Sequence, residues 1–117
     1  MIPVKNRFHG HNSLRYVYSN GKAIRTSSVT LKAVRNERRK NPRLSVVVSK
    51  KVLKSAVGRN RIRRRVYEYM RTRLPHLNDT YDIVLIVTSP ELRLQSIEEL
   101  QATIDQLLEK ADLLKTS

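Results

Sequence analysis

An unbroken apolar run at residues 83–87, inside the segment YDIVLIV at 81–87, places the strongest constraint on how this chain can fold. A strand that is apolar on both faces has to be covered on both, so the run predicts a central strand of a sheet. The run is far too short to span a bilayer, so no membrane partner is expected. The chain has 117 residues, so we expect a single domain over 1–117, with residues 1–6 flexible.

Two more strands are predicted before this run. Apolar and polar residues alternate over 28–33, which is typical of a half-buried strand. The segment 44–49 (LSVVVS) is apolar and β-branched and predicts a second strand, on which Leu44, Val46 and Val48 would share one face. A further short strand near Ile24 is left open.

Three helices complete the predicted fold. A short one is expected around residues 14–18, and a long one over 54–74 ends at Pro75. A capping box at 96–99 opens the third. The order α-β-β-α-β-α predicts an α+β fold, a two-layer α-β sandwich. The apolar stripe of the third helix is Ile97, Leu100, Ile104, Leu107, Leu108, Ala111 and Leu114.

The charge of the chain is large and unevenly distributed. The formal net charge is +14, and residues 1–75 carry 21 Lys and Arg against two acids, whereas residues 76–117 carry three against eight. So much positive charge repels itself in a compact fold, which indicates an anionic partner for the first part of the chain.

The densest charge lies on the predicted helix 54–74. Seven arginines fall between 59 and 73, with Glu68 as the single acid among them. On a helical wheel at about 100° per residue, they surround the first turns, including the side where a core should lie. Each like-charge pair one turn apart costs roughly 0.2–0.5 kcal/mol, a cost that bound phosphates reverse. Arginine also suits phosphate because its planar fork binds in a bidentate manner.

Neighbouring residues extend this basic segment. Lys50, Lys51 and Lys54 precede the helix, and Asn60 offers both a donor and an acceptor to a base or sugar edge. The alternative interpretation, a solvated basic face without a ligand, is disfavoured by the arginine density and the lack of compensating acids. The sequence therefore predicts that the segment around 49–65 binds RNA.

The same residues resemble a known family. Ser49-Lys-Lys-Val52, Ala56-Val57 and Arg59-Asn-Arg-Ile-Arg-Arg64 look like the signature of the bacterial ribonuclease P protein component, and the resemblance covers roughly residues 7–114. It implies a ribosomal-protein S5 domain 2-like fold with a left-handed β-α-β crossover. It also implies a cytoplasmic protein that pairs with a catalytic RNA and helps remove the 5′ leader of precursor tRNA.

The resemblance also implies roles for particular residues. A cleft for the leader would be lined by Leu14, Tyr18 and Lys32, although the family often has aromatic residues where this chain has Leu14 and Lys32. A packing role for Tyr18 beside Leu14 and Val17 stays open. The residues expected to contact the catalytic RNA are Lys50, Lys51, Lys54, Arg59, Asn60, Arg61, Arg63 and Arg64.

No catalytic constellation is found in the sequence. Cysteine is absent, and neither a phosphate-binding glycine loop nor a metal-ligand cluster is evident. We therefore expect no catalytic residues, no metal site and no cofactor on the chain itself, with Mg²⁺ required by the RNA-containing holoenzyme. No DNA partner is expected. Two alternatives remain: a ribosomal or RNA-chaperone protein, and a metal-dependent nuclease acting alone.

Overall fold

The computed structural model describes residues 4–8 and 11–115, and a four-stranded sheet is at its centre. The strand order is β1-β2-β4-β3, in which β4 pairs antiparallel with β2 and parallel with β3. The apolar run therefore forms a central strand, as predicted. The strands are β1 (Lys22–Arg25), β2 (Val29–Arg35), β3 (Arg43–Val48) and β4 (Tyr81–Val87).

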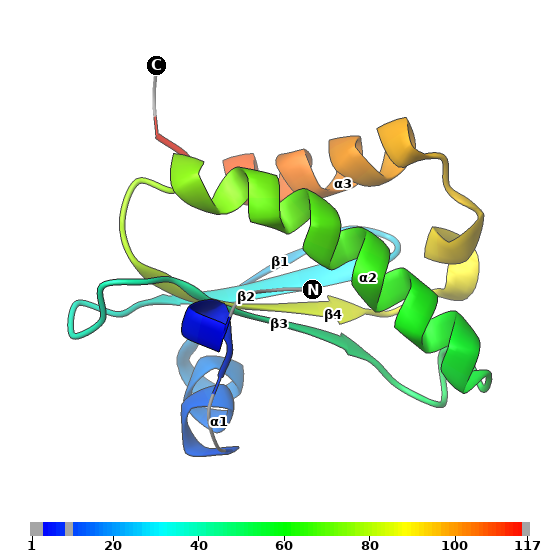
Figure 1. Ribbon diagram of the computed structural model, residues 1–117, viewed down its shortest axis with the longest axis horizontal. Coiled ribbons are helices and arrows are strands. Elements are labelled where there is room, and N and C mark those ends of the chain that lie inside the picture. Colours follow the sequence, from blue (N-terminus) through cyan, green and yellow to red (C-terminus); the bar gives the residue numbers. More distant parts are fainter. Residues whose placement is uncertain (1–3, 9–10, 116–117) are drawn as a thin grey trace.

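Three α-helices pack on this sheet. They are α1 (His11–Asn20), α2 (Ala56–Arg73) and α3 (Ile97–Lys110). Figure 1 shows α2 and α3 together on one face of the sheet and α1 on the opposite face. The predicted α+β sandwich is thus confirmed, and α2 joins the parallel strands β3 and β4 as a β-α-β crossover requires. Short 3₁₀ helices lie at Val4–Asn6 (η1), Leu74–His76 (η2) and Pro90–Leu94 (η3).

Part of the N-terminal segment that we expected to be flexible has a defined position. Residues 1–3 lie outside the described residues, but Val4–Asn6 form η1. Asn6 is buried, and its Nδ2 donates a hydrogen bond of 2.7 Å to the carbonyl oxygen of Pro42. This contact fixes η1 beside the start of β3.

The main core lies between the sheet and the pair α2 and α3. Alternate strand residues face it, as expected for the period of two. Helix α2 adds Ile62, Val66 and Met70, and α3 adds four residues of its predicted stripe, Leu100, Ile104, Leu107 and Leu108.

The stripe prediction is wrong at Leu114, which lies beyond the end of α3 at Lys110, and Ile97 is on the stripe but is not packed in the core. This side chain is 59% exposed, because α3 begins there and the side chain faces the groove beside the arginine-rich turns of α2. An amphipathic pattern predicts which side of a helix is apolar, but it does not show where the neighbouring layer ends.

Helix α1 covers only part of the other face of the sheet. Its Val17 is fully buried, as is Val84 of β4, whose side chain points away from the main core. Gly21 ends the helix, and a Cβ atom there would lie 2.5 Å from the carbonyl oxygen of Val17 and 3.2 Å from the amide nitrogen of Ala33. Glycine is therefore required where the chain turns from α1 into β1.

The capping box at the start of α3 is confirmed and gives a stability prediction. Ser96 Oγ accepts from the Glu99 amide at 3.1 Å, and Glu99 Oε1 accepts from the Ser96 amide at 3.3 Å. We expect Ser96→Ala to lower the free energy of unfolding by about 1 kcal/mol, seen as a fall of about 4 °C in Tm. Ser19→Ala, at an exposed serine of α1, is the matched control; an equal fall there would contradict a specific capping role.

Candidate nucleic-acid interface

The arginines of α2 fall into two groups, and the first is used by the fold itself. Arg59 Nη1 donates to the carbonyl oxygens of Leu53 and Lys54, at 2.9 and 2.8 Å. Arg65 Nη2 donates to the carbonyl oxygen of Gln95 at 2.7 Å. These two guanidinium groups fix the loop before α2 and the segment after η3. Part of the positive charge of the predicted RNA-binding segment therefore stabilises the fold.

Three more arginines have side-chain partners. Arg71 pairs with Glu68 at 3.0 Å, and Arg73 lies 3.3 Å from Asp105 of α3. Arg63 donates to Oδ1 of Asn60. Oδ1 of Asn60 therefore already accepts one hydrogen bond, and the NH₂ group of the same side chain is a donor that could meet an RNA acceptor.

Arg61 and Arg64 form the second group. Both are exposed, and neither has a hydrogen bond or ion pair within the part of the chain that the structure describes. Lys50, Lys51 and Lys54 are likewise exposed on the loop that leads from β3 into α2. We call these five residues the free basic patch. A group of unpaired cations on one surface attracts a polyanion and releases its counterions.

The first turns of α2 bury an apolar side chain although arginines surround them. On the helical wheel Arg59 and Arg63 lie on the side where the core is expected. Both are half-buried, yet Ile62 on the same side is only 2% exposed. Because Arg59 turns back to the loop carbonyls, its charge is solvated by the backbone and the apolar side chain reaches the sheet.

A buried ion pair on the other side of the sheet was missed by sequence reasoning. Arg43 of β3 and Asp82 of β4 are 6% and 5% exposed, and two bonds join them, Nε to Oδ1 at 2.8 Å and Nη2 to Oδ2 at 2.6 Å. Asn36 Nδ2 donates to Asp82 at 2.9 Å, and the guanidinium lies 4.9 Å from the ring centre of Phe8. The only sequence signal was one acid in an otherwise apolar strand.

The residues predicted for the leader cleft lie together on the α1 face. Lys32 Nζ of β2 donates to the carbonyl oxygen of Tyr18 at 3.0 Å and lies 5.4 Å from the centre of the Tyr18 ring. Burial raises the pKa of Tyr18. Leu14 is one turn earlier and also half-buried. Tyr18 therefore both packs against the sheet and keeps part of its ring accessible, so the two interpretations of this residue are compatible.

The sheet register shows which part of this face α1 leaves open. Lys32, Val84 and Ser45 pair across the sheet in one row, and Val84 is covered. In the next row Ile86 and Val47 are paired and remain half-buried. An apolar row beside a lysine is a suitable surface for an unpaired nucleic-acid strand.

A cavity of about 710 Å³ lies on the opposite flank of α1, and Leu14, Tyr18 and Lys32 do not line it. Its Tyr16 is 57% exposed. Sequence reasoning did not single out these residues, because they come from separate segments. The lining is Asn12, Ser13, Tyr16, Val34, Arg35, Asn36, Glu37, Arg38, Arg43 and Asp82.

Over residues 4–8 and 11–115, no three His, Cys, Asp or Glu side chains are grouped as metal ligands would be. Across the same described residues, no helix has the length and hydropathy needed to cross a membrane.

The α+β sandwich carries the free basic patch on its longest helix and on the loop before it, a charge pattern typical of nucleic-acid-binding domains. A profile of the family described as Ribonuclease P matches residues 2–112. The chain is 33% identical over 114 residues to the ribonuclease P protein component of Pseudanabaena sp. (strain PCC 6903), covering 97% of each chain. It is 39% identical to the ribonuclease P protein component of Roseiflexus sp. (strain RS-1), covering 86% of this chain and 81% of that one.

Solved structures agree in fold. The RNase P protein of Staphylococcus aureus superposes with a TM-score of 0.83 at 22% identity, covering 94% of this chain and 98% of that one. The RNase P protein of Thermotoga maritima gives a TM-score of 0.78 at 22% identity, with 89% and 96% covered. The chain belongs to the ribonuclease P protein family, which acts in tRNA processing.

Proposed function

We propose that this chain is the protein subunit of ribonuclease P and binds its catalytic RNA through the free basic patch. The observation that carries the proposal is the split among the α2 arginines. Arg61 and Arg64 are left exposed and unpaired within the described residues, whereas Arg59 and Arg65 are bonded to backbone carbonyls. Because Arg61 and Arg64 make no hydrogen bond or ion pair within the described residues, they can contact a polyanion without breaking an interaction of the fold.

The proposal extends to the substrate. The 5′ leader of precursor tRNA binds the α1 face, along the half-buried row of Ile86 and Val47 and beside Tyr18 and Lys32. Only one aromatic residue, Tyr18, stands at the three predicted cleft positions, and its neighbour Lys32 supplies charge. The leader is therefore held more by contact with the apolar row and by cations than by stacking on several rings.

The division of chemistry follows the same proposal. The catalytic RNA, with bound Mg²⁺, hydrolyses the phosphodiester bond in the cytoplasm, and this chain supplies no catalytic residue. Its described side chains can neutralise phosphates, donate hydrogen bonds and position a single strand. These are binding and orienting roles, which lower the cost of bringing substrate and catalytic RNA together.

The RNA that co-purifies with the chain distinguishes this proposal from a ribosomal or general chaperone role. The tagged full-length chain is isolated from its own cells at moderate salt, and the bound RNA is sequenced. We expect one structured RNA of the ribonuclease P type together with precursor tRNA. Predominant ribosomal RNA, or an unselective mixture, would favour the alternative.

A further inference from the structure

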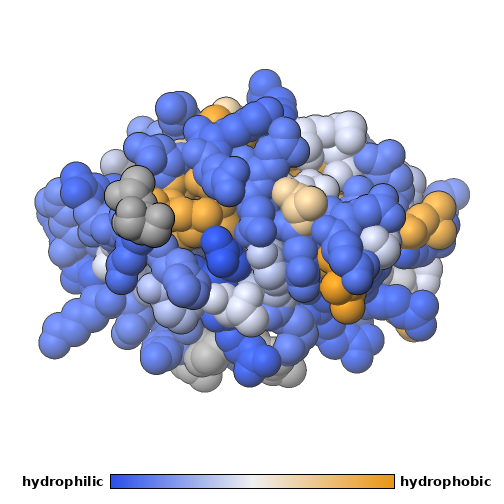
Figure 2. Space-filling view, turned by 90° about the horizontal axis from the view of Figure 1, so that it is seen from above, coloured by the Kyte–Doolittle hydropathy of each residue, from blue (hydrophilic) through white to orange (hydrophobic). Residues whose placement is uncertain are grey.

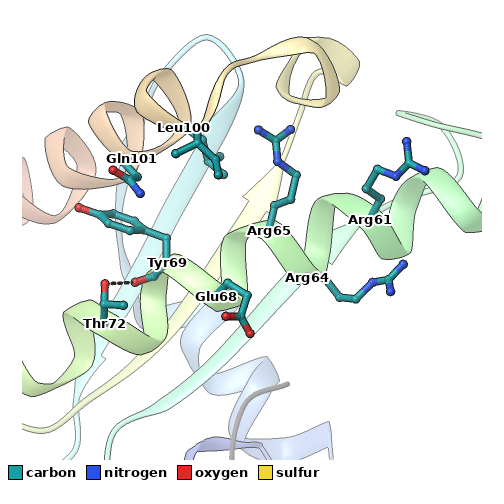
Figure 3. Close-up of a pocket in the computed structure, with 9 residues that line it drawn as sticks. Arg61, Arg64, Arg65, Glu68, Tyr69, Thr72, Leu100 and Gln101 are labelled. Carbon is teal, nitrogen blue, oxygen red and sulfur yellow. Dashed lines mark hydrogen bonds between the residues drawn. The ribbon is translucent and has the colours of Figure 1, made fainter.

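A groove between α2 and α3 has no role in the functions described so far. Its volume is about 520 Å³, and Figure 3 shows Tyr69 extending from α2 toward Gln101 of α3. It lies beside the free basic patch, with Arg61 and Arg64 among its lining residues. The lining is Arg61, Arg64, Arg65, Glu68, Tyr69, Thr72, Ile97, Leu100 and Gln101.

The walls of this groove are apolar. Leu100 is 2% exposed, and Ile97 remains 59% exposed although it belongs to the apolar stripe of α3. The half-buried ring of Tyr69 comes from the facing helix. Hydrophilic side chains cover most of the surrounding helical face, seen from above in Figure 2. The groove is thus a local apolar site on a strongly hydrophilic surface.

The charges around the groove select the kind of occupant. Arg61 and Arg64 have no partner in the part of the chain that the structure describes, Arg65 is bonded to the Gln95 carbonyl, and Glu68 is paired with Arg71. A net positive rim around apolar walls is complementary to a flat apolar group that carries anions on both sides. An unstacked nucleobase between two phosphates has this chemistry, and bases of this kind are what proteins read in folded RNA.

Two polar groups at the groove bear on recognition. The hydroxyl of Tyr69 donates to Asp105 at 2.6 Å, and burial, with the bond to Asp105 and its charge, raises the pKa of Tyr69 to about 12. Tyr69 therefore stays neutral, and its hydroxyl proton is already donated to Asp105. Gln101 is half-buried, and its side-chain amide has no hydrogen bond within the described residues. That amide offers a donor and an acceptor to a base edge.

We propose that this groove receives one unstacked nucleobase of the catalytic RNA. The base lies against Tyr69, Ile97 and Leu100, its edge meets the Gln101 amide, and Arg61 and Arg64 hold the flanking phosphates. The inference rests on the proposed function, because it assumes that the free basic patch already contacts this RNA.

The test separates apolar contact from charge. Ile97→Ser removes one groove wall and changes no charge, and Leu94→Ser is the matched control, since Leu94 is 79% exposed and does not line the groove. We expect Ile97→Ser to weaken binding of the catalytic RNA about fivefold, with an unchanged dependence on salt, and Leu94→Ser to bind as the wild type does. Thermal melting confirms that both variants are folded.

Chemical probing of the bound RNA gives a second, independent readout. With wild-type protein, one unpaired base is expected to become protected at its Watson–Crick edge. Protection is lost with Ile97→Ser and retained with Leu94→Ser. Gln101→Ala is expected to leave the base in place but to make affinity insensitive to which base stands there.

The outcomes distinguish failure of the groove from failure of the proposed function. If the wild type does not bind the catalytic RNA, the proposed function itself fails. If the wild type binds but Ile97→Ser has the same affinity and the same protection pattern, the nucleobase site is overturned. A protein segment that occupies the groove would produce this second result.

Discussion

Replacing both Arg61 and Arg64 by alanine is expected to weaken binding of the catalytic RNA about 100-fold. Each side chain is exposed and unpaired within the described residues, so its loss costs the fold little and removes one phosphate contact. A contact of this kind contributes about tenfold to affinity. The logarithmic dependence of affinity on salt should also become shallower by about two. Both quantities come from equilibrium binding measured at several salt concentrations.

The matched control removes two positive charges from a different segment of the chain. Arg38 and Arg39 lie in the turn between β2 and β3, outside α2 and its preceding loop. We expect the double replacement Arg38→Ala and Arg39→Ala to have a much smaller effect on binding of the catalytic RNA. Equal losses of affinity would mean that α2 contributes only its positive charge and that its surface makes no specific contact with the RNA.

The largest expected effect on stability is at the buried ion pair. Asp82→Asn should lower the free energy of unfolding by about 3–5 kcal/mol, because it leaves the guanidinium of Arg43 buried without a countercharge. Thermal or urea unfolding measures this loss. The paired replacement Arg43→Met with Asp82→Leu removes both charges and should recover most of the stability.

An exposed pair between the end of β2 and the bend before β4 provides the comparison. Arg35 and Asp79 lie 2.5 Å apart, but their side chains are 60% and 32% exposed. Asp79→Asn is therefore expected to change stability far less than Asp82→Asn. A similar loss at both positions would contradict the claim that burial makes the Arg43–Asp82 pair important.

Regular structure could be predicted from the sequence because it depends on local periodicity. The apolar run of β4, the alternation in β2 and β3, and the capping box of α3 all have the predicted places. The exposed Ile97 could not be predicted, because its environment depends on how the first turn of α3 is placed against α2. The hand of the crossover is likewise not encoded locally; the general rule for β-α-β units favours a right-handed one, and the left-handed sense came from the family resemblance.

The sequence predicted where the candidate site lies, but not which of its arginines stabilise the fold and which are available to bind RNA. The density of arginine on α2 identified the surface. It could not show that Arg59 and Arg65 are bonded to backbone carbonyls while Arg61 and Arg64 have no partner within the described residues. Those carbonyls belong to the segments before α2 and after η3, outside the helix whose pattern was considered. The Arg43–Asp82 pair was missed for the same reason, because its two members are brought together only by the parallel pairing of β3 and β4.

The most direct test of the central claim is cleavage of precursor tRNA by reconstituted components. The purified chain, the catalytic RNA and their mixture are each incubated with end-labelled precursor tRNA at low Mg²⁺, and release of the 5′ leader is followed. We predict no specific cleavage by the chain alone and faster cleavage by the mixture than by the RNA alone. Specific removal of the leader by the RNA-free chain, or an unchanged rate in the mixture, would contradict the account.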